Sequence, residues 1–114
     1  MNVRDKIPVC PHGTREDIDF YLVSFCDSLV NTMDEEITFS SGYRCKECNE
    51  EVGGAVNSAH LFGKAVDIAP IDSYQRYKIV AFATTKGVRR IGIAKDHIHL
   101  DLDESKKQQI MWLE

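Results

Sequence analysis

The chain has 114 residues, with 14 Lys and Arg against 18 Asp and Glu and a net charge of −4. That length provides for one hydrophobic core, so we expect a single domain over residues 1–114. The acidic balance argues against a nucleic-acid partner, because no basic stripe is present to neutralise phosphates. No apolar run of about 20 residues is available to cross a bilayer. We therefore expect no membrane insertion, and we expect a monomer.

The N-terminal segment, MNVRDKIPVCPHG, lacks the apolar stretch of about 7–15 residues that is typical of a secretory signal. We therefore expect synthesis in the cytoplasm without a signal peptide. This expectation also bears on the cysteines, because disulfide frameworks form in secreted proteins and are rare in the cytosol. A disulfide framework is accordingly not the default interpretation of the four cysteines in this chain.

The cysteines allow several interpretations. Cys26 lies among apolar residues of a predicted helix, where we expect a small buried hydrophobe. Cys45-x-x-Cys48 is compatible with a redox pair, or with half of a structural zinc site that Cys10-x-His12 would complete. Because C-x-x-C is a common pattern and C-x-H is a weak one, we favour reduced, structurally neutral thiols.

The first part of the chain predicts one helix and one strand. Thr14 is a candidate N-cap, with Asp17 in the position of a capping-box acid. Apolar residues then recur at helical spacing to about residue 33, at Ile18, Tyr21, Leu22, Phe25, Leu29 and Met33. The β-branched and aromatic run 37–40 predicts a short strand. A polar connection follows from Gly42 to about Asn57, with at most one helical turn near 47–52, and long loops of this kind are usually functional.

The second part of the chain predicts one helix and three strands. Residues 64–69 form a predicted strand that Pro70 ends, and 72–85 form a helix capped by Asp72 or Ser73. Residues 90–94 and 97–102 predict a hairpin.

In the tail, 104–114, we expect Trp112 to pack back on the body. Two helices against a small, mainly antiparallel sheet make an α+β fold.

Strand alternation brings candidate metal ligands together. Asp67 lies on the face of its strand opposite its apolar neighbours, and His97, His99 and Asp101 share one face of theirs. If the apolar faces are buried together, Asp67 and the two histidines point into a common cleft. A carboxylate in so apolar a strand is costly unless it is paired or metal-bound.

His60 is a further candidate ligand, on the loop before the strand that carries Asp67, with Gly63 allowing the backbone to turn between them. Catalytic zinc takes three protein ligands from His, Asp, Glu or Cys and keeps a fourth position for water. The alternative interpretation is a solvated acid and surface histidines. The spacing favours zinc over that alternative.

These residues resemble the zinc D-Ala-D-Ala carboxypeptidases and their relatives, the L-alanyl-D-glutamate endopeptidases of phage lysins and the vancomycin-resistance D-Ala-D-Ala dipeptidases. The shared pattern is S-x-H-x-x-G-x-A-x-D, followed by H-x-D or H-x-E. The chain carries this pattern at Ser58, His60, Gly63, Ala65, Asp67, His99 and Asp101. Upstream, Ser41-Gly42-Tyr43-Arg44 resembles the S-G-Y-R of the family, and the resemblance extends over about residues 39–102.

The resemblance implies a fold of the hedgehog and D-Ala-D-Ala-peptidase type, with one catalytic zinc held by His60, Asp67 and His99. Arg44 would bind a carboxylate or carbonyl of the substrate, for which a guanidinium fork offers parallel charged hydrogen bonds. Ser58 would bind substrate or orient His60.

Asp101 would orient a zinc ligand in the same way, since hydrogen-bond partners of this kind hold metal-binding histidines in place.

The general base has two candidates under this resemblance. Endopeptidase and dipeptidase members carry an acid three residues before the last ligand, which corresponds to Asp96. Certain carboxypeptidases carry a histidine two residues before it, which corresponds to His97. Strand alternation favours His97, which shares a face with His99, whereas Asp96 reaches the site only if the turn folds inward. On the resemblance we favour Asp96 slightly.

The function implied is a zinc metallopeptidase that hydrolyses peptide bonds in peptidoglycan stem peptides, at D-Ala-D-Ala or at L-Ala-D-Glu. The alternative is a non-catalytic zinc-containing module of the same fold that binds cell wall or a protein partner. The small size favours a phage or prophage origin, with action on the cell wall after release from the cell.

Overall fold

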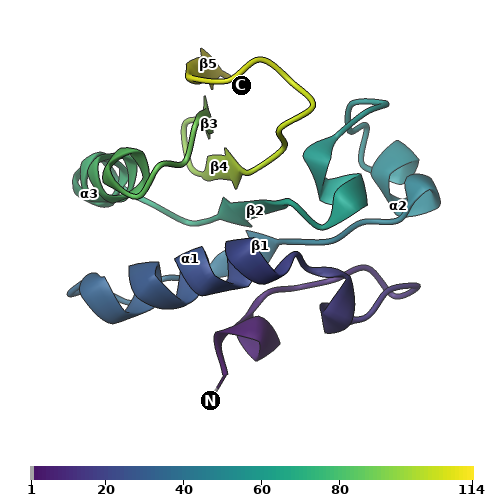
Figure 1. The fold of residues 1–114 in the computed structure, drawn as a ribbon, viewed down its shortest axis with the longest axis horizontal. Helices are drawn as coiled ribbons and strands as arrows, with labels where there is room; N and C mark the ends of the chain where they lie inside the picture. The colour runs from purple at the N-terminus through teal and green to yellow at the C-terminus, as the bar shows by residue number, and fades with distance from the viewer. Residues whose placement is uncertain (1) are drawn as a thin grey trace.

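The computed structural model describes residues 2–114 and forms an α+β arrangement around a five-stranded sheet (Figure 1). The strands are β1 (Phe39–Ser41), β2 (Ala65–Ile68), β3 (Arg90–Ile93), β4 (Ile98–Asp101) and β5 (Ile110–Leu113). Their spatial order is β1-β2-β4-β3-β5, which Figure 1 shows from bottom to top. Neighbouring strands are antiparallel except β5, which runs parallel to β3. The predicted α+β class is confirmed.

Besides the strands, the described residues form three α-helices and three 3-10 helices. The α-helices are α1 (Phe20–Thr32), α2 (Lys46–Glu51) and α3 (Ser73–Thr85), and the 3-10 helices are η1 (Val3–Lys6), η2 (Arg15–Asp17) and η3 (Ala59–Phe62). Within the described part of the chain, none of these helices combines the length and the apolar character needed to cross a membrane. The predicted start of α3 is observed, because the Asp72 carboxylate accepts a hydrogen bond from the Gln75 backbone N–H at 2.8 Å.

The predicted first helix is two elements rather than one. Thr14 and Asp17 do interact, since the Thr14 N–H donates to the Asp17 carboxylate at 2.9 Å, but they enclose only η2. The α-helix begins at Phe20, with the Asp19 carboxylate capping the amides of its first turn. Between the two elements the chain is extended, because the Asp19 N–H donates to the Gly63 carbonyl at 2.8 Å. A long-range hydrogen bond therefore interrupts the local helical pattern.

The tail contains a strand that the sequence pattern did not predict. Its residues pair in parallel with β3, in a register that places Trp112 beside Gly92. Trp112 packs back on the body as expected, with its ring centroid 5.5 Å from that of His99. A parallel pairing with a strand some way back in the chain leaves little trace in local alternation, which explains the miss.

One face of the sheet is apolar and lies against the helices. Its side chains form one core with α1 and α3, namely Val66, Ile68, Ile91, Ile98 and Leu100 with Leu22, Phe25, Cys26, Leu29, Ile79 and Ala83. Cys26 is fully buried in this core, as expected for a small hydrophobe. The opposite face of β2 and β4 carries the polar residues, and the candidate site is found there.

Candidate metal centre

The register of β2 and β4 places Asp67 directly opposite His99. The Asp67 Oδ1 atom lies 3.1 Å from His99 Nδ1 and 3.4 Å from His60 Nε2. One ligand atom from each of the three residues lies within 4.8 Å of the other two. The structure thus brings together the three side chains that the sequence predicted as metal ligands, from η3, β2 and β4.

His60 is held by its backbone and by its ring. The Ser58 hydroxyl accepts a hydrogen bond from the His60 backbone N–H at 3.2 Å and so caps η3. The Nδ1 atom of the ring lies 2.7 Å from the Gly42 carbonyl, to which it donates, and this leaves Nε2 directed at Asp67. Gly63 ends η3 at φ +66°, where a Cβ atom would lie 1.8 Å from the Asp17 carbonyl oxygen. Only glycine permits this turn.

His99 is oriented by a chain of two charged partners. Its Nε2 atom donates to Asp101 Oδ2 at 2.7 Å, and Asp101 Oδ1 accepts from Arg90 Nε at 2.8 Å. Asp101 is only 1 % exposed, so the contact with Arg90 compensates a buried negative charge. The Nδ1 atom of His99 is therefore the ring nitrogen that faces Asp67, at 3.1 Å from its Oδ1 atom. A carboxylate behind a histidine fixes the ring and its tautomer for metal binding.

The charges of the three ligands depend on one another. Burial alone would raise the pKa of Asp67, but hydrogen bonds from His60 and His99 outweigh burial and hold that pKa well below its usual range. Burial would lower the pKa of His99, but the hydrogen bonds to Asp101 and Asp67 outweigh it and raise the pKa to about 9. When no cation is bound, a proton on His99 thus balances the negative charge of the neighbouring carboxylates. A metal ion that binds here would displace that proton.

The donor set fits zinc. Two imidazole nitrogens and one carboxylate oxygen are ligands that zinc takes in catalytic sites, with a fourth corner left open. The three residues line a cleft of about 680 Å³. Besides the three ligands, this cleft is lined by the other residues predicted for the site except Asp96, namely Arg44, Ser58, His97 and Asp101.

Arg44 lies between β1 and α2, on the predicted long loop. Its backbone N–H donates to the His60 carbonyl at 3.1 Å, which fixes it beside the metal ligands. Its Nε atom is buried and has no hydrogen-bond partner among residues 2–114. Arg44 also lines the cleft, where its guanidinium group can bind an anionic or carbonyl group of a ligand.

The two candidate bases occupy different positions. His97 borders the cleft, with Nε2 2.9 Å from Glu114 Oε1 and Nδ1 3.4 Å from Asp96 Oδ1. Burial would lower the pKa of His97, but these two carboxylates outweigh it and raise that pKa above its usual value. The Asp96 side chain is 84 % exposed, and Asp96 is not among the residues that line the cleft. The turn before β4 therefore presents His97 to the cleft and Asp96 to solvent.

Trp112 and Glu114 border the same cleft and were missed as site residues. Asp67, His99, Gly92 and Trp112 form one row across four strands. A Cβ atom on Gly92 would lie 2.5 Å from Glu114 Oε2 and 3.0 Å from the Trp112 ring. The bare backbone at Gly92 therefore lets both side chains reach the histidines. A glycine inside a predicted strand was the signal available in the sequence, since it often marks such a close approach.

Residues 4–101 match the family model described as peptidase M15. The chain belongs to the peptidase M15 family. The zinc D-Ala-D-Ala carboxypeptidase of Streptomyces albus G is 49% identical over 35 residues, which cover 31% of this chain and 14% of that protein. The predicted resemblance to the zinc D-Ala-D-Ala carboxypeptidases is thereby confirmed at the level of the family.

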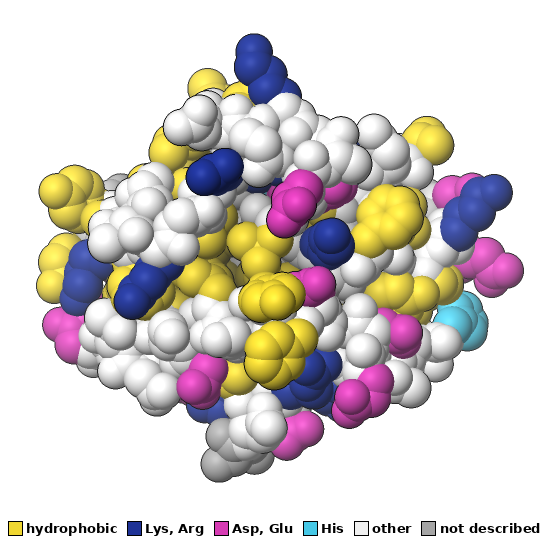
Figure 2. All heavy atoms as spheres, viewed as in Figure 1, with side chains coloured by type: hydrophobic (Ala, Val, Ile, Leu, Met, Phe, Trp, Pro, Cys, Tyr) yellow, Lys and Arg dark blue, Asp and Glu magenta, His cyan; other side chains and the backbone are white. Residues whose placement is uncertain are grey.

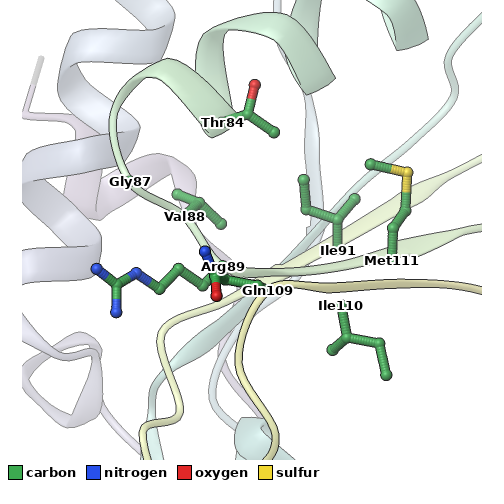
Figure 3. A pocket seen from close by; sticks show the side chains of 8 residues that line it. All are labelled: Thr84, Gly87, Val88, Arg89, Ile91, Gln109, Ile110 and Met111. Carbon is green, nitrogen blue, oxygen red and sulfur yellow. The ribbon is translucent and has the colours of Figure 1, made fainter.

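This M15 family chain has a second hollow, between the end of α3 and strands β3 and β5 (Figure 3). Its lining residues are Thr84, Gly87, Val88, Arg89, Ile91, Gln109, Ile110 and Met111. Among these described residues there is no His, Cys, Asp or Glu, so the hollow offers no metal ligand of the kinds that zinc prefers. On the face shown in Figure 2, acidic and basic side chains are interspersed. The cleft is the candidate active site because His60, Asp67 and His99 converge in it.

The four residues of the alternative zinc pattern in this M15 family chain also converge. Cys10, His12, Cys45 and Cys48 each place one ligand atom within 4.8 Å of the others. None of them lines the cleft described above. The sequence interpretation favoured neutral thiols and kept a zinc site of three cysteines and one histidine as the alternative. The structure places these four residues close enough together to hold one metal ion.

Proposed function

We propose that this chain is a zinc-dependent peptidase that hydrolyses a peptide bond in peptidoglycan stem peptides, at D-Ala-D-Ala or at L-Ala-D-Glu. The observation that carries the proposal is the convergence of His60, Asp67 and His99 on one side of a cleft that also holds Arg44 and His97. Membership of the peptidase M15 family and the local likeness to a zinc D-Ala-D-Ala carboxypeptidase support it.

His97 moves the proton in this proposal. A bound zinc ion supplies a Lewis acid that polarises a carbonyl group and lowers the pKa of water. The His97 imidazole accepts the proton of the attacking water and returns it to the leaving amine. Its contacts with Glu114 and Asp96 stabilise the imidazolium form between these steps. Asp96, which the resemblance favoured slightly, acts here through His97, because its side chain lies outside the cleft.

Arg44 selects the substrate in this proposal. Both proposed substrates carry a free carboxylate near the scissile bond, and a guanidinium group binds a carboxylate through two parallel hydrogen bonds. Arg44 lines the cleft and supplies the guanidinium group for that contact. Ser58 has a different part, since its hydroxyl already caps the turn that carries His60.

The test is digestion of purified peptidoglycan by the zinc-loaded protein, followed by mass spectrometry of the released fragments. We expect release of D-Ala, or cleavage between L-Ala and D-Glu, and no release by a His60→Ala variant. Tyr77→Ala serves as a control, because this side chain on α3 is 76 % exposed and lies outside the cleft. The proposal fails if the zinc-loaded wild type binds peptidoglycan but cleaves neither bond, or if metal-free His60→Ala still cleaves.

A further inference from the structure

Three thiols and one imidazole meet outside the active-site cleft. They come from two segments far apart in the chain, the turn after η1 and the start of α2. His12 Nδ1 lies 3.4 Å from Cys45 Sγ and 3.5 Å from Cys48 Sγ. In a tetrahedral zinc site with bonds of about 2.0–2.3 Å, adjacent ligand atoms lie roughly 3.5–3.8 Å apart. The two His12–sulfur distances match that spacing, and the ligand atoms of all four residues lie within 4.8 Å of one another.

The backbone around the cluster holds the thiols in place. Cys45 is the N-cap of α2, and its Sγ accepts from the Cys48 N–H at 3.5 Å. The Sγ atom of Cys10 accepts from the Cys45 N–H at 3.4 Å, and the Cys10 N–H donates to the Tyr43 carbonyl at 3.1 Å. Amide donors of this kind stabilise negative charge on sulfur, which a metal-bound thiolate requires. Each segment thus presents its sulfur to the other.

The turn that carries His12 is closed in the same way. The Gly13 N–H donates to the Cys10 carbonyl at 3.0 Å, so the chain reverses and brings His12 back towards α2. A Cβ atom on Gly13 would lie 2.5 Å from the Tyr43 ring. Glycine at this position allows the aromatic ring to pack against the turn.

We infer that Cys10, His12, Cys45 and Cys48 bind a second, structural zinc ion. Three soft thiolates and one imidazole are a donor set of closed structural zinc sites. Four protein ligands complete a tetrahedron and leave no corner for water, in contrast to the three ligands of the cleft. A Cys45–Cys48 redox pair would account for two of the four residues and leave the approach of Cys10 and His12 without a reason.

The second ion would support the loop that carries Arg44. Helix α2 has six residues and buries only the polar Asn49, so burial of apolar surface contributes little to its position. Isolated helices below about 12–15 residues are marginal in water. Cys45 directly follows Arg44 in the chain, so an ion bound there fixes Arg44 on one side. The hydrogen bond from Arg44 N–H to the His60 carbonyl fixes it on the other.

Cobalt substitution of the full chain tests this site. A thiolate bound to Co²⁺ gives strong near-ultraviolet charge-transfer absorption, which the nitrogen and oxygen ligands of the cleft do not give. We expect this absorption in the wild type and in His60→Ala, and its loss in a Cys45→Ser/Cys48→Ser variant. Zinc analysis should give about two ions per wild-type chain and about one in each of these variants. Cys26→Ala is the matched control, since it removes a thiol outside the cluster and should retain both ions.

Two further results decide the matter. His12→Cys should keep the second ion, because a set of four thiolates is also found in structural zinc sites. Absence of thiolate charge transfer in cobalt-loaded wild type, or a disulfide between Cys45 and Cys48 in protein purified under reducing conditions, would overturn the inference. The wild-type spectrum decides even if the double variant does not fold. Because the signal arises from sulfur alone, it is also independent of whether the cleft proves to be a peptidase site.

Discussion

The two faces of the central sheet use the same strands for different purposes. On one face, Leu100 and its neighbours are fully buried against α1 and α3. On the other, Asp67 and His99 meet across β2 and β4 beside an open cleft. Leu100 directly follows His99 in the chain, so alternation along a single strand separates the core from the site.

Residues that stabilise the fold and residues that line the cleft thus lie on opposite faces of the same strands, and not in different regions of the chain. The apolar face fixes the register of the strands, and a slip of one residue would move every side chain to the other face. The same register sets the positions of the side chains on the polar face. Substitutions on the two faces should therefore have separable effects, on the free energy of unfolding and on metal binding respectively.

The largest effect is expected for loss of a ligand on the polar face. Asp67→Ala removes the carboxylate that contacts both histidines, so the cleft should no longer hold zinc. We expect peptide cleavage to fall about 1,000-fold or more, since bound zinc contributes several kcal/mol to stabilising the transition state. Fragment release measured by mass spectrometry and zinc content measured on the same sample provide the check. Full activity in a variant that has lost cleft zinc would contradict the assignment.

Leu100→Ala tests the opposite face one residue from a ligand. Its side chain is fully buried, and replacing such a leucine by alanine costs about 2–5 kcal/mol of unfolding free energy. Urea denaturation of the metal-free protein measures this loss. Zinc content of the folded variant at saturating metal should equal that of the wild type. Loss of zinc without loss of stability would show that the two faces are not independent.

A smaller effect is expected behind the ligands, where Asp101 connects Arg90 to His99. Asp101→Asn keeps the size of the side chain but removes its charge, so the hydrogen bond that orients His99 weakens. Loss of such a partner typically lowers metal affinity by about 10–100-fold. Competition with a chelator of known affinity measures the change, and Tyr77→Ala is the control. An unchanged affinity would mean that Asp101 stabilises only Arg90.

Strand alternation predicted from the sequence that Asp67, His97 and His99 face one cleft, and the family resemblance then selected His60, Asp67 and His99 as the expected ligands. Asp67 and His99 each stand alone among apolar residues, so the faces of β2 and β4 could be assigned without knowledge of their pairing. The helix that begins after Asp72 has a capping box, which is a local signal.

The features that the sequence did not predict depend on contacts between segments far apart in the chain. The break before Phe20 follows from the hydrogen bond between the Asp19 N–H and the Gly63 carbonyl, which no local pattern encodes. The position of Glu114 follows from a parallel strand pairing. The meeting of the Cys10 and Cys45 segments depends likewise on the path of the whole chain.

The smallest effect is predicted for Asp103, which lies two residues after the end of β4. Its contribution to stability depends on its charge, whereas that of Leu100 depends on burial. Burial would raise the pKa of Asp103, but hydrogen bonds from Lys106 and Ser105 outweigh it and lower that pKa to about 2. A carboxyl group whose pKa is lower in the folded state stabilises the fold above its unfolded pKa of about 4, and this contribution disappears as the pH falls towards 2. The contribution of Leu100 involves no proton and should not change over this range.

Asp103→Asn should therefore unfold more easily than the wild type at pH 7, by about 1 kcal/mol after solvent screening of the Lys106 pair is included. The difference should shrink between about pH 4 and pH 2, because the wild-type carboxyl group becomes neutral there. Urea denaturation of both proteins across this range, with a chelator present, measures the difference directly. Asp67 also titrates at low pH, but it does so in both proteins, so its effect cancels. A difference that stays constant with pH would mean that Asp103 stabilises the end of β4 through its shape and neutral hydrogen bonds rather than through its charge.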